Sequence, residues 1–219
     1  MKSIVFDLDG TLIDSAPDIH AAVNKMLVQE GKPALSLPKV TSFIGNGLPR
    51  LVELSMAASG IDAARHAELS EVVLGHYNAA SAVLTCLYPG VKDVLLAFKS
   101  EGYRLGVCTN KPQAPTLDIL AIYSIADLFD TVLGGDALPV RKPDPAPLIK
   151  AFEDLDATGM LYVGDSEVDA ETAERAAVPF ALFTQGYRKT PVEQLTHSAR
   201  FDAFSELPGI VAAHFAKAA

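Results

Sequence analysis

The sequence of 219 residues contains no tryptophan, only two cysteines and no long hydrophobic run. Two cysteines cannot form the disulfide framework of a small secreted domain, and because Cys86 and Cys108 stand in apolar runs we expect two buried, reduced thiols. No stretch reaches the roughly 18 apolar residues that a membrane span requires. Only the short apolar run 4–6 separates Lys2 from the charge of Asp7, which argues against a secretory leader. We therefore expect a cytoplasmic protein with no membrane partner.

Positive charge is also scarce. The chain has 18 Lys and Arg against 27 Asp and Glu, which gives a formal net charge of -9 at pH 7. Such a surface repels nucleic acids and anionic membranes, so we expect no nucleic-acid partner. An anionic substrate would need local positive charge against this background. Isolated basic residues in loops and acids able to hold a divalent cation are therefore the features of interest.

Strand and helix patterns alternate after Pro89-Gly90, and this alternation predicts a doubly wound, Rossmann-like parallel sheet of the α/β class. Strands are expected at 2–6, 103–108, 131–133, 160–163 and 180–183. Helices are expected at 91–100 and 113–122, from the Pro-rich loop at 141–145 to about residue 154, from residue 167 onward, and at 207–217.

Between the first strand and this alternating part, the pattern is only helical. Ser15 is expected to cap a helix through a capping box with Asp18, and further helices are expected at 48–59 and 62–77. We therefore predict a catalytic core of residues 1–14 and 83–219, with an all-helical cap of residues 15–82 inserted after the first strand.

Polar side chains follow four of the predicted strands, where an open parallel sheet binds its ligands. They are Asp7 and Asp9, Thr109 and Asn110, Lys142, and Asp165 with Asp169. Three carboxylates that face one another need a cation, and hard oxygen ligands suit Mg²⁺. A carboxylate such as Asp7 can attack phosphorus, and its neighbour Asp9 can act as general acid and then general base. Positive charge and hydrogen-bond donors would neutralise the phosphoryl oxygens.

Four motifs carry a resemblance to a known family. They are DLDGTL at 7–12, TNKP at 109–112, RKPDP at 141–145 and GDSEVD at 164–169. In this order and behind these strands they resemble the haloacid dehalogenase superfamily over nearly the whole chain. Within that superfamily, LDGTLIDSAPD at 8–18 and FIGNG at 43–47 look like the phosphoglycolate phosphatases. The segment 176–179 departs from relatives, which often carry glycine before the last strand.

The resemblance implies a hydrolase that converts 2-phosphoglycolate to glycolate and phosphate through an aspartyl-phosphate. It implies Asp7 as nucleophile and Asp9 as acid/base, with a mobile helical cap. It also implies Mg²⁺ held by Asp7, the backbone carbonyl of Asp9 and Asp165, with Asp169 in support. Thr109, Asn110 and Lys142 would bind the phosphoryl group.

The partner would be a small phosphorylated organic acid, whose carboxylate also needs a binding site. The backbone N–H groups of Gly45, Asn46 and Gly47 could supply one, and Arg50 could add a bidentate contact. Arg50 is equally consistent with an ordinary surface charge. His20 is expected to pack between helices or to face solvent.

Several alternatives stay open. Asp169 and Thr109 could serve only as helix caps.

Other functions of the whole protein also stay open. A sugar-phosphate mutase of the same superfamily would use the same motifs. A phospho-accepting receiver domain is a different class, although it would be a single compact domain of about 120 residues without an insert. Asp9 and Lys142 beside three carboxylates suit a metal ion and a phosphate, whereas a dehalogenase needs neither of these ligands. The full set of Asp7, Asp9, Lys142 and Asp165 argues against an inactive scaffold. Monomer and homodimer are both compatible with the sequence.

Overall fold

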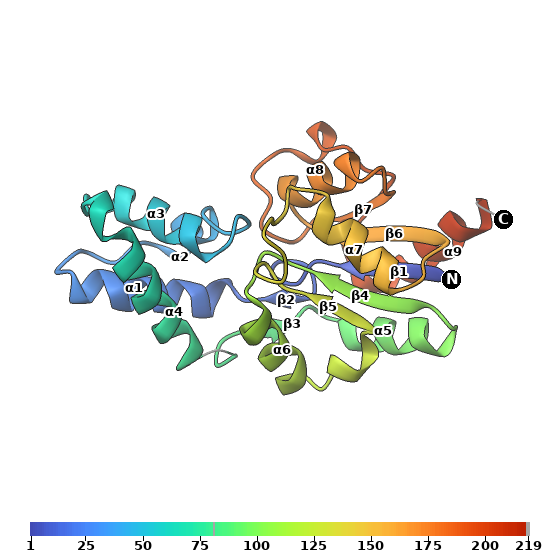
Figure 1. Ribbon diagram of the computed structural model, residues 1–219, viewed down its shortest axis with the longest axis horizontal. Coiled ribbons are helices and arrows are strands. Elements are labelled where there is room, and N and C mark those ends of the chain that lie inside the picture. Colours follow the sequence, from blue (N-terminus) through green and yellow to red (C-terminus); the bar gives the residue numbers. More distant parts are fainter. Residues whose placement is uncertain (81, 218–219) are drawn as a thin grey trace.

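A computed structural model describes residues 1–80 and 82–217 of the chain, which form two parts (Figure 1). One part is a six-stranded parallel sheet in the order β5-β4-β1-β6-β7-β8. Its strands are β1 (Lys2–Phe6), β4 (Arg104–Cys108), β5 (Thr131–Leu133), β6 (Gly159–Gly164), β7 (Phe180–Phe183) and β8 (Ala199–Phe201). The doubly wound sheet is confirmed, and β8 is an edge strand that the sequence patterns did not reveal.

Helices cover both faces of this sheet. They are α5 (Val91–Ser100), α6 (Gln113–Ile122), α7 (Ala146–Asp154), α8 (Glu167–Arg175) and α9 (Leu207–Lys217). The apolar residues of α5, α6 and α9 share one core cluster with Ile4 and Phe6, whereas those of α7 and α8 share another with Val5. This alternation along β1 is the two-residue period of a strand buried on both faces. Short 3₁₀ turns lie at Ala126–Leu128, Val192–Gln194 and Phe204–Glu206.

The second part is an all-helical cap at one end of the sheet (Figure 1). Its helices are α1 (Ala16–Gln29), α2 (Leu37–Thr41), α3 (Leu48–Ala58) and α4 (His66–Asn78), with a 3₁₀ turn at Ala63–Arg65. The apolar stripes of these helices pack into a separate cluster around Val23, Met26 and Val52, to which the core adds Tyr187. The cap is thus stabilised mainly by its own interior. The short α2 was not predicted, and the exact boundaries at residues 14 and 83 stay a prediction.

Two extended segments join the cap to the core. They are β2 (Ile13–Asp14) and β3 (Cys86–Leu87), which pair antiparallel. The predicted capping box at Ser15 was wrong, because the Ser15 side chain makes no cap hydrogen bond. Asp18 instead accepts hydrogen bonds from the backbone N–H of Leu84 and from the N–H and hydroxyl of Thr85, so it fastens the returning segment to α1.

The two cysteines differ in exposure. Cys108, at the end of β4, is buried as expected. Cys86 is exposed, so the expectation for it was wrong. Its apolar neighbours suggested a core strand, but β3 is only a two-residue ribbon beside the cap. None of the helices in the described part of the chain has the length and apolar character needed to cross a membrane.

Candidate active site

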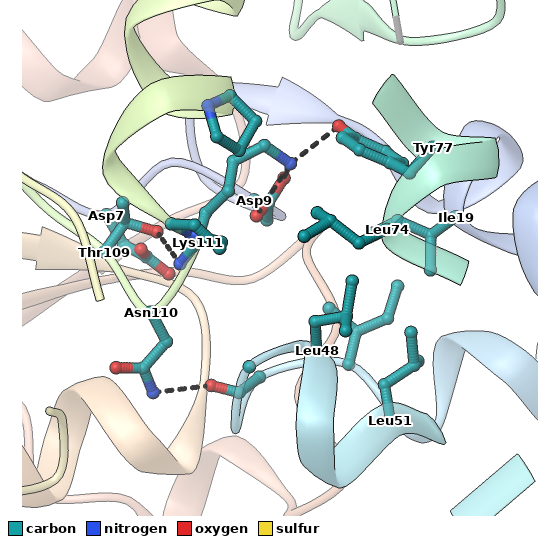
Figure 2. Close-up of a pocket in the computed structure, with 15 residues that line it drawn as sticks. Asp7, Asp9, Ile19, Leu48, Leu51, Leu74, Tyr77, Thr109, Asn110 and Lys111 are labelled. Carbon is teal, nitrogen blue, oxygen red and sulfur yellow. Dashed lines mark hydrogen bonds and ion pairs between the residues drawn. The ribbon is translucent and has the colours of Figure 1, made fainter. Parts of the chain in front are cut away.

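The site lies where β4, β1 and β6 end side by side, facing the cap. Asp7 follows β1, Thr109 follows β4 and Asp165 follows β6, and these three strands are neighbours in the sheet. Parallel strands present their carboxyl ends at one edge, so residues far apart in sequence converge there. Figure 2 shows the pocket between this edge and the cap, with Asp7, Asp9 and Thr109 in its wall.

Three buried carboxylates form a cluster at this edge. Asp7, Asp165 and Asp169 each place an oxygen within 4.8 Å of the others. Burial, together with the negative charge of Asp169, raises the pKa of Asp7 to about 7, although Lys142 opposes the shift. Burial, together with the negative charges of Asp169 and Asp7, raises the pKa of Asp165 well above its ordinary value. A divalent cation would offset this repulsion, so the donor set fits a hard metal ion.

The backbone around Asp165 is shaped to fit its carboxylate. Asp165 accepts hydrogen bonds from the Thr11 hydroxyl at 2.7 Å and from the Tyr187 N–H at 2.6 Å. A Cβ on Gly10 would lie 2.5 Å from one of its oxygens, and a Cβ on Gly186 would lie 2.2 Å from it. Only glycine therefore fits at these two positions, and the loop at Gly186 was not singled out from the sequence.

Lys142 is a buried cation of the site rather than a surface lysine, with 3% of its surface exposed. Its Nζ lies 2.9 Å from Asp7 Oδ1, 2.7 Å from Asp169 Oδ1 and 2.9 Å from the Tyr162 hydroxyl. Burial would lower the pKa of Lys142, but the charges of Asp169 and Asp7 outweigh it and raise the pKa well above the ordinary value. The ammonium therefore stays charged between the two carboxylates.

Asp169 caps a helix and also contacts the buried lysine of the site, while its support of a metal ion stays a prediction. It forms a true capping box with Ser166 at the start of α8. It also accepts hydrogen bonds from Lys142 and from the Tyr162 hydroxyl, each at 2.7 Å. Burial raises the pKa of Asp169, yet the Lys142 charge and these hydrogen bonds together lower it below the ordinary value. Asp169 is thus an ionised support that holds Lys142 beside Asp7.

Asp9 lies apart from the carboxylate cluster. One of its oxygens accepts hydrogen bonds from the Ser15 hydroxyl at 2.5 Å and from Lys111 Nζ at 3.1 Å. Its partners come from the start of the cap and from the loop after β4, on the cap side of the pocket. The two aspartates of the first motif are two residues apart, but their side chains lie in different parts of the site. Asp7 belongs to the carboxylate cluster, whereas Asp9 lies beside Lys111.

Lys111 is a site residue that the sequence reasoning missed. It is 7% exposed and lines the pocket, and its Nζ also donates to the Tyr77 hydroxyl at 2.6 Å. Burial would lower its pKa, but Asp9 and Tyr77 outweigh that effect and raise it. Like Lys142, it is a basic residue in a strand-end loop of an acidic chain, so the same criterion could have selected it.

Asn110 reaches the pocket with its donors already used. Its amide nitrogen donates to the backbone carbonyls of Gly45 and Lys142, each at 3.0 Å. Its buried Oδ1 has no partner among the described residues. Asn110 thus joins the cap loop to the core in this conformation. Thr109 lines the pocket, and its hydroxyl accepts a hydrogen bond from the Lys111 N–H at 3.3 Å.

The cap residues chosen from the sequence divide into two groups. Gly45 and Gly47 line the pocket, whereas Asn46 and Arg50 do not. The Arg50 side chain is 50% exposed and pairs with Glu53 at 2.7 Å, one turn further along α3. The structure thus places Arg50 at the surface, because its helix turns Leu48 and Leu51 toward the pocket instead. His20 contacts the Leu35 carbonyl within the cap, which confirms its packing role.

Comparison with known proteins identifies the family of this chain. The family model of haloacid dehalogenase-like hydrolases matches residues 4–183. A phosphoglycolate phosphatase of Cereibacter sphaeroides is 51% identical over 213 residues, which cover 96% of this chain and 98% of that protein. A phosphoglycolate phosphatase of Rhodobacter capsulatus is 43% identical over 215 residues, which cover 95% and 96%.

A solved structure agrees with the sequence relatives. It is described as a predicted phosphoglycolate phosphatase from Haemophilus somnus 129PT, and it matches with a TM-score of 0.91 at 32% identity, over 96% of this chain and 97% of that chain. The sequence relatives and the solved structure thus agree over nearly the whole chain. This chain belongs to the haloacid dehalogenase-like hydrolases, as a phosphoglycolate phosphatase-like member of that family.

Proposed function

We propose that this protein hydrolyses small phosphorylated organic acids, with 2-phosphoglycolate as the main substrate. The observation that carries the proposal is the buried pair of Asp7 and Lys142, whose charged atoms lie 2.9 Å apart at the end of β1. A fixed carboxylate beside a fixed cation suits nucleophilic attack on a phosphoryl group whose oxygens need neutralisation. The names of the relatives support the choice of substrate.

Mg²⁺ is the proposed cofactor. Asp7, Asp165 and the backbone carbonyl of Asp9 would hold it, and Asp169 would support them through Lys142. When bound, the ion would supply positive charge to the phosphoryl oxygens and offset the repulsion within the carboxylate cluster. The raised pKa values of Asp7 and Asp165 support this assignment, because both carboxylates lack enough positive charge in the protein alone.

In the first step, an Asp7 carboxylate oxygen forms a bond to phosphorus while the bond from phosphorus to the ester oxygen breaks. Asp9 gives its proton to that leaving oxygen, so that glycolate departs as an alcohol. Lys142 neutralises charge on the phosphoryl oxygens, and the Thr109 hydroxyl donates a hydrogen bond to them. The product of this step is an aspartyl-phosphate on Asp7.

In the second step, Asp9 takes a proton from water, and the water oxygen bonds to phosphorus as the aspartyl bond breaks. Phosphate leaves, Asp7 is regenerated, and Asp9 is again protonated for the next turnover. The cap would exclude bulk water during the first step and admit one water molecule for the second. The Asn110 contact to Gly45 is one of the links that would change with cap position.

The test is phosphate release from a panel of esters, with Mg²⁺ or with a chelator, by the wild type and by Asp7→Asn. The panel contains 2-phosphoglycolate, hexose phosphates, nucleotides and pyrophosphate. We expect Mg²⁺-dependent turnover that is fastest with 2-phosphoglycolate and abolished in the variant. Faster turnover of another ester would contradict the assignment of 2-phosphoglycolate as the main substrate, but it would not contradict the mechanism. If no ester is hydrolysed, the proposal fails and the mutase becomes the better hypothesis.

A further inference from the structure

The part of the pocket that faces the cap is lined mainly by apolar side chains. They are Ile19, Ile44, Leu48, Leu51, Leu74, Pro112 and Pro115. Figure 2 labels Ile19, Leu48, Leu51 and Leu74 among them. A carboxylate placed against this wall would lose hydration without compensation. An acidic substrate therefore needs a specific cationic or hydrogen-bonding partner here. Within residues 1–80 and 82–217, Lys111 is the cationic side chain that lines this part of the pocket.

Lys111 has binding capacity that its protein contacts do not use. An ammonium group carries three N–H donors. One is directed at Asp9, whose oxygens lie 3.1 and 3.4 Å from Nζ, and one at the Tyr77 hydroxyl at 2.6 Å. The third has no acceptor in the described part of the chain. Because Lys111 lines the pocket, a bound ligand is the acceptor left for this donor.

Tyr77 offers a second donor at the same place. Its oxygen accepts the hydrogen bond from Lys111, and its own O–H donates to none of the residues that the structure describes. Figure 2 shows the two side chains pointing toward each other across the pocket, one from the core loop after β4 and one from α4 of the cap. An N–H and an O–H side by side match the two oxygens of a carboxylate.

The contact with Asp9 places these donors on the correct side of the substrate. Asp9 is the proposed acid at the ester oxygen, and Lys111 touches it directly. In 2-phosphoglycolate a single methylene separates the ester oxygen from the carboxylate carbon. A group that binds this carboxylate must therefore lie beside Asp9, which is where Lys111 and Tyr77 are.

We propose that Lys111 and Tyr77 together bind the carboxylate of the leaving group and so select α-carboxylate phosphomonoesters. This inference rests on the proposed function and assigns the substrate carboxylate to a different place from Arg50. Since Tyr77 belongs to the cap and Lys111 to the core, the binding site is complete only when the two parts meet. An acidic substrate therefore favours the arrangement in which cap and core are in contact.

The test compares two esters that differ in the carboxylate, 2-phosphoglycolate and 2-hydroxyethyl phosphate. The readout is the ratio of their kcat/KM values, because damage to Asp9 or to the fold lowers both and leaves the ratio unchanged. In Lys111→Met we expect the ratio to fall by about 30-fold or more, and in Tyr77→Phe by about 10-fold. Lys25→Met removes an exposed lysine from α1 and is the matched control, with an unchanged ratio.

Each other outcome is decisive. An unchanged ratio in both Lys111→Met and Tyr77→Phe, with wild-type preference for 2-phosphoglycolate, would overturn the inference and leave the proposed function intact. A fall in the ratio in Arg50→Ala instead would assign the carboxylate to α3. Equal use of both esters by the wild type would show that no carboxylate is selected. Hydrolysis of neither ester would be a failure of the proposed function itself.

Discussion

The two ends of the pocket draw their residues from different parts of the molecule. The proposed phosphoryl end consists of Asp7, which lines the pocket, and of three residues grouped with it behind the pocket lining, Asp165, Asp169 and Lys142. All four come from the core and are buried. The leaving-group end consists of Asp9 and Lys111 from the core with Tyr77 from the cap.

Each end contains a buried lysine, but only the Lys111 ammonium contacts the cap. The residues that would act on the phosphoryl group, which all esters share, can therefore be fixed within one domain. The residues that would recognise a particular leaving group can instead come from both domains.

The largest effect is expected at the phosphoryl end. Lys142→Met removes the charge that lies between Asp7 and Asp169, so we expect kcat to fall by about 10³-fold for every ester tested. The free energy of unfolding should also fall, by about 3 kcal/mol, because two buried carboxylates lose their partner. Steady-state kinetics and urea unfolding measure these changes.

The contrast with Lys111→Met makes the comparison specific. That variant should lower the ratio of acidic to neutral ester, whereas Lys142→Met should leave the ratio near the wild-type value. Equal changes of the ratio in both variants would contradict the division of the pocket into two ends.

The carboxylate cluster also predicts a dependence of stability on pH in metal-free protein. The pKa of Asp7 is raised to about 7 in the folded state from an ordinary value of 3.8, so the folded state binds more protons between these pH values. The free energy of unfolding is therefore expected to decrease as pH rises from about 4 to 7, by roughly 1 kcal/mol for each pH unit in that interval. Urea unfolding in chelator at pH 5 and at pH 7.5 measures the change.

Mg²⁺ should reverse this loss. Because the ion competes with protons for Asp7 and Asp165, its stabilising effect is expected to be greater at pH 7.5 than at pH 5. The variant Asp7→Asn is the control, since it removes the titrating group and should reduce the pH dependence. Equal stabilisation by Mg²⁺ at both pH values would contradict the metal assignment at the phosphoryl end.

Tyr187 connects the phosphoryl end with the cap linker. Its backbone N–H holds Asp165, while its hydroxyl donates to Asp14 at 2.7 Å and accepts from the N–H groups of Ser15 and Ala16. Tyr187→Phe removes only the hydroxyl, so we expect a loss of about 1–3 kcal/mol of stability with little change in metal affinity.

Thermal unfolding and Mg²⁺ titration check the Tyr187 prediction. Tyr103→Phe is the matched control, because the Tyr103 ring packs on Phe98 and Phe215 and its hydroxyl has no hydrogen-bond partner in the described part of the chain. A loss of Mg²⁺ affinity in Tyr187→Phe would show that the linker and the phosphoryl end are not separable.

The smallest effect is expected outside both ends. Ala177 follows α8 with a φ of 54°, in the left-handed region that favours glycine. Ala177→Gly should raise stability by about 0.5–1 kcal/mol and leave both kinetic readouts unchanged. Ala176→Gly is the control, because Ala176 has an ordinary φ of -81° and gains nothing from glycine. A lower stability of Ala177→Gly would contradict this explanation.

The convergence of the candidate residues could be predicted from the sequence because three of the four motifs directly follow buried strands. The exception is the motif at 141–145, which lies in the loop beyond the half-buried β5. The strands at 2–6, 104–108 and 159–164 are apolar runs of the right length, and parallel packing then brings Asp7, Thr109 and Asp165 to one edge. The segment 176–179, where relatives often carry glycine, was also informative, since Ala177 has a positive φ.

The cap side could not be predicted in the same way, because it depends on how two domains meet. Tyr77 looks like the last residue of an ordinary amphipathic helix, and only its position opposite Lys111 gives it a role. Arg50 seemed suitable from its charge and its distance from Gly47, but the rotation of α3 directs it to solvent. Ser15 and Asp18 have the spacing of a capping box, yet tertiary contacts with Asp9 and Thr85 use both side chains.

The proposed mechanism depends above all on Asp7 as the nucleophile, and trapping the phosphoryl group on this residue tests it. In Asp9→Asn the base for the second step is absent, while 4-nitrophenyl phosphate has a leaving group that needs no acid. Acid quenching with Mg²⁺ present, followed by peptide mass spectrometry, should then find one phosphoryl group on the peptide that contains Asp7, with one equivalent of nitrophenolate released in a burst. Nitrophenolate release with no phosphorylated peptide, or a phosphoryl group on Asp165 or Asp169, would contradict this mechanism.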